Sequence, residues 1–358
     1  MARKNSRYSN PIRILKNILT RYLFLLPLIC LLFLLKNFHY HFNLNLKNLS
    51  NISKISTNSL PKIKLEKEIN SAVLVPFNKN CWSELSIFIP FLNKFLNQNN
   101  NTNTNVKYQI YIINQIDNNR FNRGALLNIG YLLTRNISDF LILHDVDLLP
   151  LNPNLLKFYA QISTSISDKL DSKVVHISPP EFHPKYNFQN FIGGIISLSV
   201  KSFENLNGFS NNYWGWGKED DDFHLRIFKR NMTIIKPKIE DLGSAANKLN
   251  TFRHIHNEKL RPRDKSLLGS KRLNVSSSGI SDLIENDDFY QLISTKYVWF
   301  GDVKEINLAQ ISPNTNLIKP AIMFDVELYC DDDQFICTEE QAKKLQDEKN
   351  IQRKLNRV

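Results

Sequence analysis

Short apolar runs alternate with amphipathic stretches between residues 71 and 150. The runs at 71–77, 107–114 and 140–143 have the length of buried strands, and the stretches at 82–98 and 121–135 have helical spacing. Asn122 stands where a helix N-cap is expected. This order of strand and helix predicts an α/β fold, a Rossmann-like doubly wound parallel sheet. A further strand is predicted at 191–199, where Gly193 and Gly194 allow close approach of a ligand or backbone.

Two carboxylates, Asp145 and Asp147, follow the strand at 140–143. A period of two places them on the same side of an extended backbone. Open α/β sheets bind ligands beyond the carboxyl ends of their strands, and Asp-x-Asp there is typical of a divalent cation site for a nucleotide diphosphate. A solvated acidic turn is the alternative, and the pair alone does not separate the two.

The net charge of +12 first suggests a nucleic-acid binder. Residues 1–65, however, contain eleven Lys or Arg and no Asp or Glu, so the other 293 residues carry 35 bases and 34 acids. Because the remainder of the chain is nearly neutral, we expect no nucleic-acid partner.

An uncharged apolar stretch, residues 22–35, lies behind six basic residues. It is short for a span, but flanking Arg21 and Lys36 can reach the interfaces. A cleaved signal peptide and a core helix are the alternatives. The basic residues favour a single transmembrane anchor with a cytoplasmic N-terminus. We therefore divide the chain into a cytoplasmic tail (1–21), a signal anchor (22–38), a stem (39–70), a catalytic domain (71–337) and a charged C-terminal tail (338–358).

Four cysteines and six glycosylation sequons fit an oxidising lumen. Cys330 and Cys337 are close enough in sequence to predict a short disulfide, Cys30 lies in the apolar span, and Cys81 is left as a packed thiol. The sequons begin at Asn48, Asn51, Asn100, Asn136, Asn231 and Asn274.

Two later stretches are rich in candidate site residues. In the first, Trp214 and Trp216 alternate with glycines and precede four acids, 219–222, that open a predicted helix. A helix dipole needs only one or two acids, so one carboxylate is a candidate general base on a hydroxyl. In the second, His254 and His256 have a spacing of two. Two imidazoles with an Asp suit Mn²⁺ or a similar first-row cation better than Ca²⁺.

These stretches resemble, in order, the motifs of the β-1,4-galactosyltransferase family, and within it the xylosylprotein 4-β-galactosyltransferase branch. The matching stretches are VPF (75–77), FNRGALLNIGY (121–131), HDVDLLP (144–150), FIGGIISLS (191–199), NGFSNNYWGWGKEDDDF (207–223) and TFRHIH (251–256). The resemblance implies a glycosyltransferase-A fold, UDP-galactose as donor, Mn²⁺ as cofactor and inversion at the anomeric carbon. It also implies a single-pass type II Golgi membrane protein with a luminal catalytic domain.

The resemblance assigns roles position by position. Asp220 would be the catalytic base on the acceptor's 4-hydroxyl, and Asp147, His254 and His256 would bind the metal. The donor-site residues would be Pro76, Phe77, Phe121, Asn122, Arg123, Asp145 and Trp216. The acceptor-site residues would be Tyr186, Trp216, Glu219 and Asp221. The basic segment 257–279 would be a lid that closes over the diphosphate.

Two positions depart from the family pattern. The turn after VPF is Asn78-Lys79-Asn80 instead of an arginine-bearing turn, and Phe188 replaces the second tyrosine of a Tyr-x-Tyr pair. The acceptor therefore stays open between a β-xyloside, such as xylosylated protein, and a GlcNAc- or glucose-terminated glycoside. A catalytically silent sugar-binding relative is a third alternative.

Overall fold

The computed structural model describes residues 68–97, 106–160, 172–259, 261–263, 277–298, 319–331 and 335–355. All of these residues belong to one compact unit, Glu66–Val358. The predicted tail and anchor, and the stem up to residue 67, lie outside the described residues. Among the residues that are described, no helix is long and apolar enough to cross a membrane.

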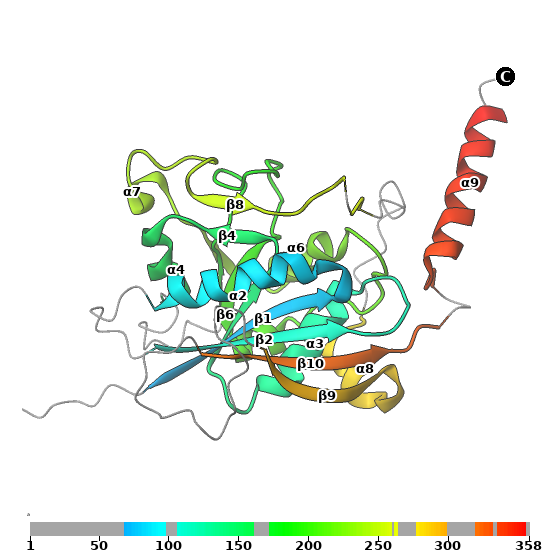
Figure 1. Ribbon diagram of the computed structural model, residues 1–358, viewed down its shortest axis with the longest axis horizontal. Coiled ribbons are helices and arrows are strands. Elements are labelled where there is room, and N and C mark those ends of the chain that lie inside the picture. The colour runs from blue at the N-terminus through cyan, green and yellow to red at the C-terminus, as the bar shows by residue number, and fades with distance from the viewer. Residues whose placement is uncertain are drawn as a thin grey trace, which may run out of the picture. The chain divides into compact units, whose positions relative to one another are not determined.

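An eight-stranded sheet forms the centre of the described unit (Figure 1). Its order is β7-β5-β6-β3-β1-β2-β10-β9. These strands are β1 (Ile69–Asn78), β2 (Val106–Gln115), β3 (Phe140–His144), β5 (Lys173–His176), β6 (Ile195–Ser199), β7 (Thr233–Ile235), β9 (Tyr290–Val298) and β10 (Ala321–Leu328). A separate two-stranded ladder pairs β4 (Leu148–Pro150) with β8 (Phe252–His254).

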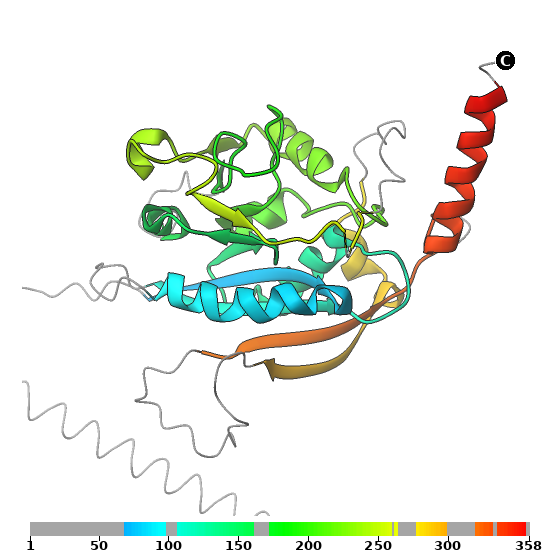
Figure 2. The same cartoon turned by 45° about the horizontal axis from the view of Figure 1, so that its top comes forward.

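Helices cover both faces of this sheet (Figures 1 and 2). The helices of the described residues are α2 (Trp82–Leu96), α3 (Arg123–Thr134), α4 (Leu156–Ala160), α5 (Val200–Asn205), α6 (Glu219–Lys229), α7 (Ile239–Leu242), α8 (Ile280–Glu285) and α9 (Glu339–Leu355). Short 3-10 turns occupy 79–81, 153–155 and 287–289. Pro90 lies inside α2, and the Asn122 side chain caps α3 as predicted.

The central strand β1 is apolar on both faces because each face is covered by helices. Val73, Val75 and Phe77 belong to the hydrophobic cluster on the α2 side. Ala72 and Leu74, at the alternate positions, belong to the cluster on the α3 side. Alternate side chains of β1 therefore pack into the two hydrophobic clusters, one on each face of the sheet, and these clusters form the core beneath the site.

The sheet is mixed, so the prediction of a parallel doubly wound sheet is correct only in part. β1 is parallel to β2 and β3, and β10 is parallel to β2. β6, however, is antiparallel to both β3 and β5, and β9 is antiparallel to β10. Between β5 and β6 the described chain contains no crossover helix, so it returns from the edge where β5 ends and must run in the opposite direction.

The strand predicted at 191–199 begins only at Ile195. Gly194 has a φ of +82°, and a Cβ there would lie 2.3 Å from Ser178 Oγ. The carbonyl of Gly193 accepts a hydrogen bond from Ser178 Oγ (3.2 Å). The two glycines thus form a tight entry to β6 at the carboxyl edge of the sheet.

The Asp-x-Asp pair does not continue β3, which corrects the prediction of an extended backbone. β3 ends at His144, and residues 146–147 form a turn in which Leu148 N donates to Asp145 O (3.4 Å). Because the backbone turns here, Asp145 and Asp147 have separate surroundings.

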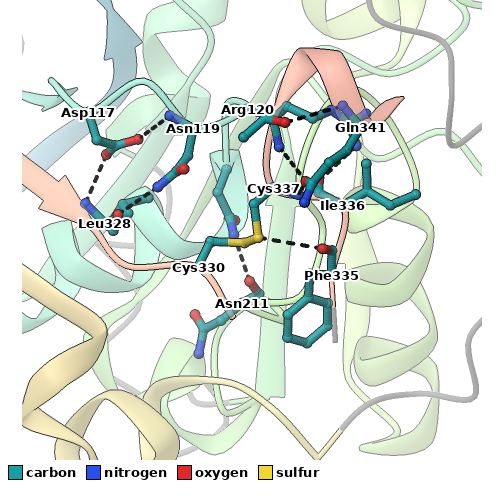
Figure 3. The surroundings of a disulfide bond; sticks show 12 residues. Asp117, Asn119, Arg120, Asn211, Leu328, Cys330, Phe335, Ile336, Cys337 and Gln341 are labelled. Carbon is teal, nitrogen blue, oxygen red and sulfur yellow. Dashed lines mark hydrogen bonds between the residues drawn. A yellow bond between two sulfur atoms is a disulfide. The ribbon is translucent and has the colours of Figure 1, made fainter. Parts of the chain in front are cut away.

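The predicted disulfide between Cys330 and Cys337 is present (Figure 3). Cys81 is a free, partly buried thiol. The charged tail forms α9, which stands apart from the sheet in Figure 2.

Asn128 joins α3 to the segment before α6, and its replacement should destabilise the fold. The buried side chain donates to Phe209 O (2.7 Å) and to Asn211 Oδ1 (2.8 Å) and accepts from Phe209 N (2.9 Å). Asn128→Ala leaves these buried groups unpaired, so we expect a loss of about 2–3 kcal/mol in the free energy of unfolding. Urea denaturation of the full chain in detergent measures it. The exposed Lys94→Ala change on α2 is the control, and a loss below about 0.5 kcal/mol for Asn128→Ala would contradict this account.

Candidate active site

A cavity of ≈ 780 Å³ lies at the carboxyl edge of the sheet, beyond the ends of β1 and β3. This volume suits a ligand larger than a simple monosaccharide. Most of the predicted site residues line it. They are Pro76, Phe121, Arg123, Asp145, Asp147, Tyr186, Trp216, Glu219, Asp220, Asp221, His254 and His256.

Two predicted donor-site residues lie behind the cavity wall. Phe77 is fully buried in the α2-side core, with its ring 5.6 Å from that of Trp82. Asn122 is also fully buried; its side chain accepts from Ala125 N (3.0 Å) and donates to Asn211 O (2.6 Å). Both residues therefore hold neighbouring lining residues in place.

The β4–β8 ladder brings Asp147 to the two histidines. Leu148 pairs with His254, and Ile255 N donates to Asp147 O (2.8 Å). As a result, Asp147 Oδ2 lies 3.5 Å from His254 Nε2 and 3.9 Å from His256 Nδ1. One carboxylate and two imidazoles, separated by about a hundred residues in sequence, converge here.

Both imidazoles are suited to accept a cation. Burial lowers the pKa of His254 and of His256 below the usual histidine value. The neutral rings therefore each keep a lone pair, and an oxygen–nitrogen donor set of this composition suits Mn²⁺ and similar metals.

Two arginines from the following segment lie among these donors. Arg263 Nη2 is 3.4 Å from Asp147 Oδ2 and 3.3 Å from His254 Nε2. Arg261 Nη2 is 2.8 Å from His256 Nδ1. Within the described residues no group of three His, Cys, Asp or Glu side chains is close enough to hold a metal as it stands. The two guanidinium groups contact the same donor atoms, as expected for a donor set that attracts positive charge.

On the other side of the turn at residues 146–147, Arg123 pairs with the acidic side chains. Its Nε donates to Asp145 Oδ1 (2.8 Å), and its Nη1 lies 3.8 Å from Glu219 Oε1. Burial, and then the Asp220 carboxylate, raise the pKa of Glu219 to about 8, while Arg123 lowers it. Burial also raises the pKa of Asp220, again opposed by Arg123. One buried guanidinium thus balances several carboxyl groups.

Asp220 lies in the first turn of α6, where Lys218 enters the helix with a φ of 78°. A Cβ at Gly193 would lie 3.4 Å from Asp220 Oδ2 and 2.7 Å from the Phe191 ring. Only glycine fits between these side chains, so Gly193 allows the Asp220 carboxylate to face the cavity.

The two tryptophans have different roles. Trp214 is buried and packs near Phe289, with ring centroids 6.4 Å apart. Trp216 lines the cavity, 6.5 Å from Tyr186 between ring centroids. Arg263 lies over both Trp216 (5.1 Å) and Tyr186 (5.7 Å). The wall formed by Tyr186 and Trp216 has the flat apolar surface that stacks on sugars or cations.

Sequence reasoning missed two residues that line the cavity, His183 and Cys81. His183 Nδ1 accepts from Lys185 N (3.1 Å) and Tyr186 N (3.0 Å), and its ring stacks on Tyr186 at 5.0 Å. Cys81 Sγ accepts a hydrogen bond from Arg261. A single histidine or cysteine carries no pattern that could have revealed either role.

Comparison with known proteins agrees with this geometry. A family model described as the N-terminal region of glycosyl transferase group 7 matches residues 41–159, and one described as the N-terminal domain of galactosyltransferase matches residues 173–255. Mouse β-1,4-galactosyltransferase 7 is 36% identical over 201 residues, 56% of this chain and 55% of the relative. The xylosylprotein 4-β-galactosyltransferase of Caenorhabditis elegans is 38% identical over 228 residues, 62% of this chain and 72% of the relative.

The chain spans about half the length of its mouse, human and Drosophila relatives. Among solved structures it is similar to a mutant of Drosophila β-1,4-galactosyltransferase 7 in complex with manganese, UDP-Gal and xylobiose. That similarity has a TM-score of 0.58 at 31% identity and covers 74% of this chain and 96% of that one. The xylobiose complex of the same Drosophila catalytic domain gives a TM-score of 0.57 at 31% identity, with the same coverage. With its motifs, mixed α/β fold and site geometry in agreement, the chain belongs to the β-1,4-galactosyltransferase family.

Proposed function

We propose that this protein transfers galactose from UDP-galactose to the 4-hydroxyl of a β-xyloside, such as xylosylated protein, with Mn²⁺ as cofactor. One observation carries the proposal: a single cavity holds the Asp147–His254–His256 donor set, the Asp220 carboxylate and the Tyr186–Trp216 wall. The relatives named for galactose transfer, and the Drosophila structures with manganese, UDP-Gal and xylobiose, support it.

The donor binds on the side of Pro76, Phe121 and Arg123. Phe121 gives the uracil ring an apolar contact, and Arg123 holds Asp145 toward the sugar side of the nucleotide. Asp147, His254 and His256 would hold Mn²⁺. When bound, the ion supplies the positive charge that stabilises the diphosphate leaving group.

Asp220 acts as the general base. It accepts the proton of the acceptor's 4-hydroxyl while that oxygen bonds to the anomeric carbon and the bond from this carbon to the UDP oxygen breaks. This single displacement inverts the anomeric configuration. Arg123 favours the ionised form of Asp220, because it opposes the rise in the pKa of Asp220 that burial causes.

The acceptor sugar lies between Asp220 and the aromatic wall. Tyr186 and Trp216 offer a face for stacking, and Asp221 and Glu219 accept hydrogen bonds from its hydroxyls. Phe188 is 49% exposed, and its ring lies edge-on to that of Tyr186, 6.1 Å away between centroids. Because Phe188 lacks the hydroxyl of the tyrosine that the family pattern has at this position, this edge of the cavity is apolar.

The protein is proposed to be a single-pass type II membrane protein of the Golgi with its catalytic domain in the lumen. The charge asymmetry around residues 22–38, the sequons and the disulfide support this location.

A transfer assay tests the function. The full chain in detergent is incubated with UDP-galactose, Mn²⁺ and β-xyloside, GlcNAc or glucose acceptors, and the products are analysed by mass spectrometry. We expect transfer to the xyloside. Transfer to GlcNAc alone would refute the xylose assignment, and transfer to none would favour a silent sugar-binding relative.

Replacement of the base should separate chemistry from binding. Asp220→Asn removes the proton acceptor and keeps the side-chain shape, so we expect kcat to fall at least about a hundredfold. UDP binding in Mn²⁺, measured by calorimetry, should persist because Asp220 is not among the predicted nucleotide contacts. Loss of UDP binding in this variant would assign Asp220 to the donor site instead.

Removal of the guanidinium group nearest to Asp147 should strengthen metal binding in the nucleotide-free protein. Arg263→Ala frees Asp147 Oδ2 and His254 Nε2 from a competing cation, and we expect the dissociation constant for Mn²⁺ to fall several-fold. Electron paramagnetic resonance of free Mn²⁺ measures it. Lys259→Ala, an exposed charge of the same segment, is the matched control for net charge; an equal effect of both changes would show that only long-range charge is involved.

A further inference from the structure

The C-terminal disulfide lies against the loop that enters the donor side of the cavity (Figure 3). Cys330 follows β10, and Cys337 precedes α9. Arg120 N donates to Cys337 O (2.7 Å), and Arg120 Nη1 donates to Ile336 O (3.1 Å). Arg120 directly precedes Phe121, which lines the cavity.

Arg120 ties the two segments together because its charge is buried. Only 1% of the residue is exposed. A buried guanidinium needs hydrogen-bond acceptors, and the loss of one costs more than at the surface. The carbonyl group of Ile336 is such an acceptor, and that of Cys337 accepts from the backbone N–H of Arg120, so the positions of this segment and of Arg120 depend on each other.

The loop has a second anchor at the end of β10. Ile116 N donates to Val326 O (3.0 Å), Leu328 N donates to Asp117 Oδ2 (2.8 Å), and Asn119 Nδ2 donates to Leu328 O (2.9 Å). These hydrogen bonds attach the loop directly to strand β10 of the sheet. Ile336 and Cys337, by contrast, belong to no helix or strand, and the covalent bond to Cys330 fixes them beside the loop.

From Arg120 the contacts lead into the site. The carbonyl of Phe121 accepts from Gly215 N (2.9 Å), next to Trp216. Gln115 links both ends of the loop, because its Nε2 donates to Arg120 O (3.1 Å) and its Oε1 accepts from Asn122 N (3.0 Å). A shift of Arg120 therefore moves the segment that carries Phe121, Asn122 and Arg123.

We propose that the Cys330–Cys337 disulfide positions the nucleotide side of the site through Arg120, so that reduction of this bond weakens nucleotide binding and leaves acceptor binding nearly unchanged. The nature of the ligand rests on the proposed function; the coupling between the disulfide and the loop does not. The acceptor side depends mainly on other segments, because Tyr186 is held by His183 and Asp220 lies in the first turn of α6.

Hydrogen exchange and calorimetry on the full chain in detergent, oxidised or reduced, test the proposal. Alkylation and mass spectrometry verify that Cys330 and Cys337 have been reduced. We expect faster amide exchange at 116–123 and an unchanged rate in β1. The dissociation constant for UDP in Mn²⁺ should rise about tenfold, as the loss of one or two hydrogen bonds predicts. The KM for UDP-galactose should rise with it, while the KM for the xyloside stays within about twofold.

Variants provide the controls. The double variant Cys330→Ser, Cys337→Ser should reproduce the effect of reduction. Arg120→Lys keeps the positive charge but loses the planar guanidinium group with its several donors, so it should also raise the UDP dissociation constant. Thr338→Ala removes the hydrogen bond from Gln341 N to Thr338 Oγ1 (3.2 Å) at the start of α9 and should leave UDP binding unchanged.

Unchanged exchange at 116–123 after verified reduction would overturn the proposal, as would an equal rise of both KM values. A variant that fails to fold does not decide the matter, because the reduced native chain carries the same test. If the oxidised chain binds no UDP, the proposed function fails, and the exchange experiment still decides whether the disulfide holds the loop.

Discussion

The three-residue ladder between β4 and β8 is the constraint on which the site depends. It is short, and its pairing of Leu148 with His254 fixes the register of the two segments. A shift of one residue would turn every side chain to the opposite face, and Asp147 would no longer face His254 and His256. The backbone bond from Ile255 N to Asp147 O extends the pairing just beyond the strands. The register of this small ladder therefore decides whether the candidate metal ligands Asp147, His254 and His256 converge.

Electrostatic balance is the second constraint, since six carboxyl groups line the partly buried cavity. Arg123 compensates Asp145 and Glu219 on one side. Arg261 and Arg263 occupy the other side, around Asp147 and the two imidazoles. Buried charges are costly unless paired, so a cation is required in both places. On the side of Asp147 it comes from the segment after the ladder, at the proposed metal site.

The sequence predicted those features that depend on local pattern. β1, β2 and α3 with its Asn122 cap followed from periodicity and capping chemistry, and the short spacing of Cys330 and Cys337 predicted their bond. The spacing of His254 and His256 indicated a metal site, and the resemblance to the family added Asp147 to it.

Features that depend on long-range packing could not be predicted in this way. The reversed direction of β6 follows from how the chain returns between β5 and β3, and the turn after His144 separates two aspartates that a period of two places together. The pattern alone leaves Trp214 and Trp216 equivalent; the family resemblance assigned Trp216 to the site, and the structure places Trp214 in the core and Trp216 at the cavity. Arg120 carries no motif, and its importance comes from burial against a segment more than two hundred residues away.

The two sides of the cavity are supported by different parts of the fold, and this has a consequence for binding. Phe121 and Arg123 follow a loop fixed by β10 and the disulfide, whereas Tyr186 rests on His183, whose Nδ1 accepts two backbone N–H groups and must therefore be unprotonated. Burial lowers the pKa of His183 to about 3, which keeps this arrangement intact across the physiological range. Because the two sides rest mainly on different segments, changes at one side should have little effect on the proposed ligand affinity of the other. The sides meet where Gly215 N binds Phe121 O, next to Trp216, so this contact is where the occupancy of one side can influence the other.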